Sequence, residues 1–103
     1  MISLISINMQ LQPNQVYTSS SINSSTYNPE VYRGYFFSDK PFKVVILQSV
    51  DNINFDFVNY YHPDSRDSNF QCGFVVDVLA NYVQVQIINE NSLNTFIRGA
   101  LNV

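Results

Sequence analysis

Apolar and polar residues alternate along most of the chain, and almost no segment has the three-to-four-residue spacing of an amphipathic helix. The clearest case is the segment 82–88, in which Val83, Val85 and Ile87 fall on one side of the chain. Gln84 and Gln86 fall on the other side. This pattern predicts a strand with one buried face and one solvated face.

The same alternation predicts further strands at 2–7, 31–37, 42–50, 55–61, 70–78 and 93–101. The segment 42–50 is apolar on both faces, so we expect it to be central and covered on both sides. The polar segments 12–29 and 62–69 are predicted to be loops, with at most one short strand near 16–22.

This count of roughly seven to eight strands, with no helix, predicts an all-β fold. We expect an antiparallel β-sandwich of the jelly-roll type, formed as a single domain by residues 1–103. The polar region within residues 1–29 is interpreted as an arm or long loop that becomes ordered on assembly.

Composition narrows the class of protein. Hydrophobic residues make up 46% of the 103 residues and charged residues only 13%, which excludes a disordered tail. No apolar run is long enough for a membrane helix. The single cysteine, Cys72, excludes a disulfide framework and a cysteine-rich zinc site. The single histidine, His62, leaves little for a histidine-based metal centre. Cys72 is in phase with Phe70 and Phe74, so we expect it to be a small buried hydrophobe.

The charge balance argues against two classes of partner. The net charge is −3, and the five cations are scattered along the chain: Arg33, Lys40, Lys43, Arg66 and Arg98. Nucleic acids and anionic membranes both require clustered cations, so neither is an expected partner. Most hydrophilic positions carry Asn, Ser or Gln instead. Such a neutral surface suits a subunit covered by neighbours, or a surface that hydrogen-bonds neutral sugars.

A family resemblance covers residues 42–101. A buried strand ends in Leu47-Gln48-Ser49, a turn Val50-Asp51-Asn52 follows, and then Ile53-Asn54-Phe55, while a later strand carries Ala80-Asn81-Tyr82-Val83-Gln84-Val85. This order resembles the galactose-binding-like (discoidin-type) jelly rolls, especially those of small phage and viral virion proteins that decorate capsids or associate with fibres. Asn52 stands where the family has a turn glycine, and Asn81 and Gln84 stand where it often has arginines.

Two groups of residues are candidates for binding. Tyr32, Tyr35, Tyr60 and Tyr61 are candidates for an aromatic platform for sugar rings, with a place in the core or at a subunit interface as the alternative. Asp51, Asn52, Asn54 and Asp56 are candidates for a calcium site built from oxygen ligands. The alternative for this second group is a plain turn in which Asp and Asn bond their own backbone.

The segment 62–67 also contains the residue types of a catalytic triad, namely Ser65, His62 and Asp64 or Asp67. Triads need side chains that converge from distant rigid segments, and these residues are adjacent on one polar segment. We therefore expect a non-enzymatic protein without a cofactor.

The sequence thus favours a structural or interaction protein of a virus or phage particle, with other virion proteins and copies of itself as partners. Such a protein resides in the virion, and in the host cytoplasm during assembly. The N-terminus lacks the basic and long apolar regions of a secretory signal. The alternative is a carbohydrate-binding module that recognises a neutral glycan through end loops and tyrosines.

Overall fold

The computed structural model describes residues 2–66 and 69–103, which form strands and one short 3-10 helix. The elements are β1 (Ser3–Leu11), β2 (Val16–Thr18), β3 (Ile22–Asn23), η1 (Ser25–Tyr27), β4 (Val31–Ser38), β5 (Phe42–Ser49), β6 (Phe57–Tyr61), β7 (Asp64–Arg66), β8 (Asn69–Asp77), β9 (Tyr82–Asn89) and β10 (Thr95–Asn102). The described residues therefore hold ten strands rather than seven to eight. They include no helix that could cross a membrane.

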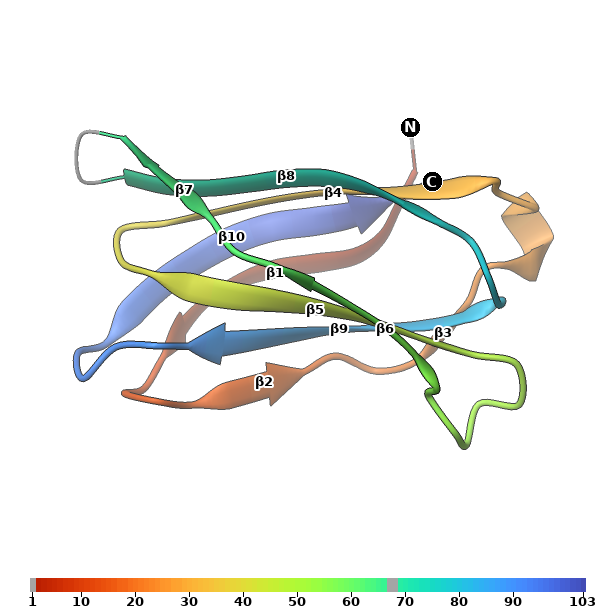
Figure 1. Ribbon diagram of the computed structural model, residues 1–103, viewed down its shortest axis with the longest axis horizontal. Coiled ribbons are helices and arrows are strands. Elements are labelled where there is room, and N and C mark those ends of the chain that lie inside the picture. The colour runs from red at the N-terminus through yellow and green to blue at the C-terminus, as the bar shows by residue number, and fades with distance from the viewer. Residues whose placement is uncertain (1, 67–68) are drawn as a thin grey trace.

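The strands form two antiparallel sheets that face each other as a sandwich (Figure 1). Sheet A has the order β1-β10-β4-β8-β7, and sheet B has the order β2-β9-β5-β6, with β3 also paired to β9. We count β2 and β3 together as one strand position, and β7 and β8 together as another, and number the resulting eight positions along the chain. Sheet A then has the order 1-8-3-6 and sheet B the order 2-7-4-5. Successive positions thus alternate mostly between the sheets, which is the connectivity of a jelly roll.

Strand β5 lies in sheet B between β9 and β6, as expected of a central strand. Phe42, Val44 and Ile46 are fully buried on its inner face. Val45 on the outer face is also buried, although no third layer covers this sheet. Its cross-strand neighbours Tyr60 and Gln86 flank it, so side chains of adjacent strands provide the cover on that side.

The core is one apolar cluster drawn from both sheets. Its largest fully buried members are Tyr32, Phe36, Phe42, Leu11, Ile46, Ile87, Ile97 and Leu101. The predicted alternation is confirmed in β9, where Val83, Val85 and Ile87 are fully buried. It is also confirmed in β8, where Cys72 and Val76 are buried and their sequence neighbours are exposed.

The N-terminal segment is more structured than the sequence indicates. Strand β1 continues past residue 7 to Leu11, which is fully buried in the core. The predicted loop 12–29 contains β2 and β3, both paired with β9. Between them, Ser19 exchanges two hydrogen bonds of 2.9 Å with the backbone of Val85. A role for this segment as an assembly arm stays a prediction, but in the single chain it belongs to both sheets.

The predicted loop 62–69 is also partly a strand. Asp64–Arg66 form β7, which pairs with β8 at the edge of sheet A. The loop prediction was wrong for these three residues because all three are polar and show no alternation of apolar and polar positions. They form a strand only because they pair with β8.

The two ends of the chain lie side by side in Figure 1, where the N–H of Val103 donates to the carbonyl oxygen of Ile2 at 3.0 Å. At the opposite end of the sandwich, the buried side-chain amide of Asn89 makes hydrogen bonds to two connecting segments. Its nitrogen donates to the carbonyl oxygens of Gln12 and Leu93, and its oxygen accepts the hydroxyl of Thr95. One side chain thus joins the β1–β2 turn to the β9–β10 turn.

Candidate functional site

The four candidate tyrosines do not form a common platform. Tyr32 is fully buried, and its hydroxyl lies 2.7 Å from the Ser24 hydroxyl and donates to the carbonyl oxygen of Ala80 at 3.1 Å. Tyr61 is half-buried and stacks on Phe74 of the other sheet, with ring centroids 4.1 Å apart. These two rings pack against the interior, which is the alternative that the sequence left open for them, so they do not join the exposed tyrosines in one platform.

Tyr35 and Tyr60 are exposed, but they lie on the outer faces of different sheets. Tyr35 projects from sheet A with its ring centroid 6.0 Å from that of Phe37. Tyr60 projects from sheet B, with the Nζ of Lys43 4.5 Å from its ring centroid. A single ligand therefore cannot contact both rings across the sandwich.

Among the candidate calcium ligands, the carboxylate of Asp51 accepts hydrogen bonds from its own turn. Oδ1 of Asp51 accepts the N–H groups of Ile53 and Asn54 and the hydroxyl of Ser49, at 2.8–2.9 Å. Oδ2 accepts the side-chain amide of Asn54 at 3.1 Å. These hydrogen bonds, with those from Asn54 and Ile53 foremost, hold the pKa of Asp51 far below its usual value.

The other two candidates point elsewhere. Asn52 has a left-handed backbone with φ of 61° and accepts a hydrogen bond from Ser21 of the β2–β3 connection. Asp56 is exposed beyond the turn. Among the residues that the structure describes, no group of three or more His, Cys, Asp or Glu side chains could hold a metal ion. The geometry is that of the alternative, a turn stabilised by its own Asp and Asn side chains.

The residues of the triad considered above make separate contacts in the structure. His62 lies on the surface with its Nδ1 3.8 Å from a carboxylate oxygen of Glu90, on the β9–β10 connection. Asp64 and Ser65 lie on β7 and pair with Gln71 and Phe70. Asp67 lies outside the described residues.

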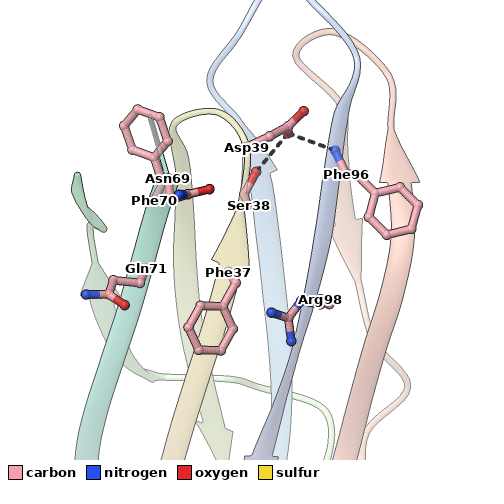
Figure 2. A pocket seen from close by; sticks show the side chains of 8 residues that line it. All are labelled: Phe37, Ser38, Asp39, Asn69, Phe70, Gln71, Phe96 and Arg98. Atoms are coloured by element: carbon pink, nitrogen blue, oxygen red, sulfur yellow. Dashed lines mark hydrogen bonds between the residues drawn. The ribbon is translucent and has the colours of Figure 1, made fainter. Parts of the chain in front are cut away.

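A hollow that the sequence did not indicate lies on the outer side of sheet A, towards the end where β4 turns into β5 (Figure 2). Its volume is about 460 Å³. The lining residues come from β4 and its turn, from β8 and from β10: Phe37, Ser38, Asp39, Asn69, Phe70, Gln71, Phe96 and Arg98. Three neighbouring strands thus place apolar rings beside amide, carboxylate and guanidinium groups.

Arg98 and Phe37 form the base of this hollow. They are direct cross-strand partners in β10 and β4, and the guanidinium carbon lies 4.7 Å from the ring centroid. This is the geometry of a cation–π contact, which favours a position of the guanidinium beside the Phe37 ring. Figure 2 shows the two side chains next to each other, with Asp39 at the opposite end of the hollow.

Asp39 is held in place as an ionised group. Partial burial works to raise its pKa, but hydrogen bonds from Lys40 and from the N–H of Phe96 outweigh that effect and lower it. Oδ2 lies 3.0 Å from the Nζ of Lys40, and Oδ1 accepts the N–H of Phe96 at 3.3 Å. The negative charge of Asp39 is therefore matched locally by Lys40.

A second hollow of about 240 Å³ adjoins the first and shares Phe37 and Gln71 with it. Tyr35, Asp64, Cys72 and Gly73 complete its lining. A Cβ atom added at Gly73 would meet nothing within 4 Å, so the missing side chain keeps this hollow open. Cys72 is otherwise buried, as expected, and burial followed by the charge of Asp64 raises the pKa of its thiol to about 11.

Comparison of the chain with protein-family models, with curated proteins and with solved structures returned no match. The resemblance to galactose-binding-like jelly rolls therefore rests on the motif residues alone.

Proposed function

We propose that this protein is a non-enzymatic structural subunit of a virus or phage particle that packs against neighbouring subunits, copies of itself among them. In that role it resides in the virion, and in the host cytoplasm while the particle assembles. The proposal is supported by one side of the molecule that is built for contact with a neutral protein surface.

That side is formed by residues 2–29, which include no Asp, Glu, Lys or Arg. All eight acids and all five cations of the chain come later, from Glu30 onwards. The segment also exposes apolar side chains: Ile2 and Val16 are about half exposed, as is Tyr27. We call residues 2–29 the neutral side.

The neutral side holds one edge of each sheet. Within the described residues, β1 pairs only with β10, and β2 pairs only with β9. An edge strand presents unpaired N–H and C=O groups, and proteins usually guard such edges with charges, proline or bulges. Strand β1 has nine residues without charge or proline and one irregularity near Ser3. It is therefore suited to pairing with a strand of another chain.

Charge favours a second copy as that partner. Each chain has a net charge of −3, so two copies repel when their charged regions face each other. Contact through the neutral side keeps those charges apart. Antiparallel pairing of two β1 strands about a two-fold axis would also be self-complementary, as the commonest oligomers are.

The test places a charge on this edge. Asn8 is exposed on the outer face of β1, and Asn8→Lys should shift the protein towards the monomer in sedimentation velocity. Val75→Lys is the matched control, since Val75 is exposed on β8, three strands away in sheet A. Equal effects of the two substitutions would show that the neutral side is not the contact surface.

Binding of a carbohydrate is a second candidate function. The observation that favours it is the hollow on sheet A, where an aromatic ring, a guanidinium, a carboxylate and amides line one concave surface. Protein sites for sugars combine these groups, because a sugar ring has an apolar face and a rim of hydroxyls. Titration with glycans, followed by NMR of the Phe37 and Arg98 signals, tests this candidate. Unchanged signals across a broad set of glycans would contradict it.

A further inference from the structure

We propose that the outer face of sheet A binds an acidic oligosaccharide, with a carboxylate-bearing sugar at Arg98 and a neutral sugar in the adjoining hollow beside Gly73. The proposal rests on the second candidate function and deepens it, because it names the ligand class and divides the surface into two subsites. It does not depend on the proposed role in assembly.

The two hollows adjoin each other along β4 and share Phe37 and Gln71, and together we call them the trough. Phe37 and Tyr35 are successive outward-facing residues of that strand, with ring centroids 6.0 Å apart. Small residues flank Tyr35 on both neighbouring strands, because its cross-strand partners are Gly73 on β8 and Ala100 on β10. The ring of Tyr35 therefore stands clear of its strand neighbours and can pack against the apolar face of a sugar, while the ring of Phe37 carries the guanidinium of Arg98.

The first subsite is selective for a carboxylate. The guanidinium of Arg98 forms no ion pair with a carboxylate in the described part of the chain. It is exposed and lies over the ring of Phe37, and its planar N–H groups can donate two parallel hydrogen bonds to a carboxylate. Asp39 at the far end of this hollow already has Lys40 as its partner, so it does not cancel the charge of Arg98.

Hydrogen-bonding groups around the first subsite favour a sugar over another carboxylate ligand. Asn69 and Gln71 line the β8 side of the hollow, and Asp39 lines its end. Figure 2 shows the Asn69 amide pointing from β8 towards Ser38 on β4. Amide and carboxylate groups placed around an aromatic ring match the several hydroxyls of a sugar, whereas the side chain of an acidic peptide offers none of them.

The second subsite disfavours a carboxylate. Asp64 lines it, and none of Arg33, Lys40, Lys43 and Arg98, the cations whose side chains the structure describes, lies within ion-pair distance of this carboxylate. A second carboxylate placed there would be repelled, but a sugar hydroxyl could donate to Asp64. The trough as a whole therefore favours a chain in which acidic and neutral sugars alternate.

Three tetrasaccharide probes separate these claims in isothermal titration calorimetry. The first is a hyaluronan tetrasaccharide, in which glucuronate alternates with N-acetylglucosamine. The second is the all-neutral tetramer of N-acetylglucosamine, and the third is the all-acidic tetramer of galacturonate. We expect the alternating probe to bind the wild-type protein about tenfold more tightly than either of the others, because only it satisfies both subsites.

Two substitutions locate the site. Arg98→Gln should remove the preference for the alternating probe over the neutral one. Lys43→Gln is the matched control, because Lys43 also lies over an aromatic ring, Tyr60, but on the outer face of sheet B. Gly73→Leu should abolish binding of the alternating probe while leaving the melting temperature near that of the wild type, because the added side chain enters open space.

Each outcome decides something. Equal binding of the neutral and alternating probes would overturn the acidic specificity but leave carbohydrate binding standing. Tightest binding of the all-acidic probe would overturn the division into two subsites. No binding of any probe by folded protein would overturn this inference and the second candidate function together. Loss of binding in Lys43→Gln but not in Arg98→Gln would place the site on the other sheet.

Discussion

The side-chain oxygen of Gln48 on β5 accepts a hydrogen bond from the backbone N–H of Ala80 at 3.1 Å. This bond joins β5 of sheet B to the connection between β8 and β9. The same oxygen accepts the N–H of Leu79 at 2.8 Å, and the side-chain nitrogen donates to the carbonyl oxygen of Asp77 at 2.9 Å. Gln48 is fully buried. One amide thus satisfies three backbone groups at the end of β8 and in the connection that follows it.

Replacement of Gln48 should therefore be costly. Gln48→Leu leaves three partly buried backbone groups unpaired, and we expect a loss of about 3 kcal/mol in the free energy of unfolding. Gln86→Leu is the control, since Gln86 makes only an exposed hydrogen bond to Thr18, and it should cost less than about 1 kcal/mol. Urea unfolding of both variants measures the difference. Equal stabilities would contradict the role assigned to Gln48.

Two glycines of sheet A should respond differently to the same substitution. A Cβ at Gly99 would overlap the carbonyl oxygen of Tyr35 and the side chain of Phe36, so Gly99→Ala forces the backbone of β4 and β10 apart. We expect it to destabilise the protein by about 2 kcal/mol or more. Gly73→Ala meets only open space and should be neutral or slightly stabilising. Thermal unfolding of the pair checks this, and a harmless Gly99→Ala would contradict the close packing.

The Asp51 turn should make stability depend on pH in the acid range. The folded-state pKa of Asp51 lies below its ordinary value of 3.8 because hydrogen bonds favour the ionised form. Its contribution is therefore complete above about pH 4 and is lost as pH falls towards the folded-state pKa. Melting temperatures from pH 6 downwards should fall less steeply in Asp51→Asn than in the wild type. Parallel curves for the two proteins would show that the turn does not act in this way.

Calcium should have no effect on the same turn. The carboxylate oxygens of Asp51 already accept four hydrogen bonds, and Asn52 is turned towards Ser21. Millimolar calcium should therefore leave the melting temperature unchanged. An increase of several degrees that disappears in Asp51→Asn would instead support the calcium site that was one of the two interpretations of this sequence.

The thiol of Cys72 should be nearly inert in the folded protein. The thiolate is the reactive form, and burial raises the pKa of Cys72 to about 11. At pH 8 only about one molecule in a thousand carries the thiolate, so reaction with a disulfide reagent should be slow. The same protein in denaturant supplies the control and should react at the rate of an ordinary cysteine. Rapid reaction without denaturant would show that Cys72 is accessible.

The strands with regular alternation could be predicted from sequence, whereas of the short strands only one, near 16–22, was indicated. In β9, Val83, Val85 and Ile87 alternate with glutamines, which is enough to assign both the strand and its buried face. Strands β2, β3 and β7 have two or three residues each, too few to show a period. They exist because β8 and β9 offer edges to pair with, and that information lies in the tertiary fold.

The candidate trough was missed for a related reason. Phe37 and Arg98 are 61 positions apart in sequence, and only the register of β4 on β10 makes them neighbours. The sequence signal was present, since Phe96 and Arg98 occupy the polar side of an alternating strand. It pointed to an exposed face with an aromatic residue, but not to which strand would lie beside it. The sequence left Tyr32 open between a binding surface and the core, because a buried tyrosine and an exposed one look alike without their partners.

The mass of the purified protein in solution tests the central claim, which is self-association through the neutral side. Light scattering after size exclusion, over a range of concentrations, should give a mass of two or more chains of 11.8 kDa each, with Asn8→Lys returning to a single chain. A mass of one chain for the wild type at every concentration would contradict the account.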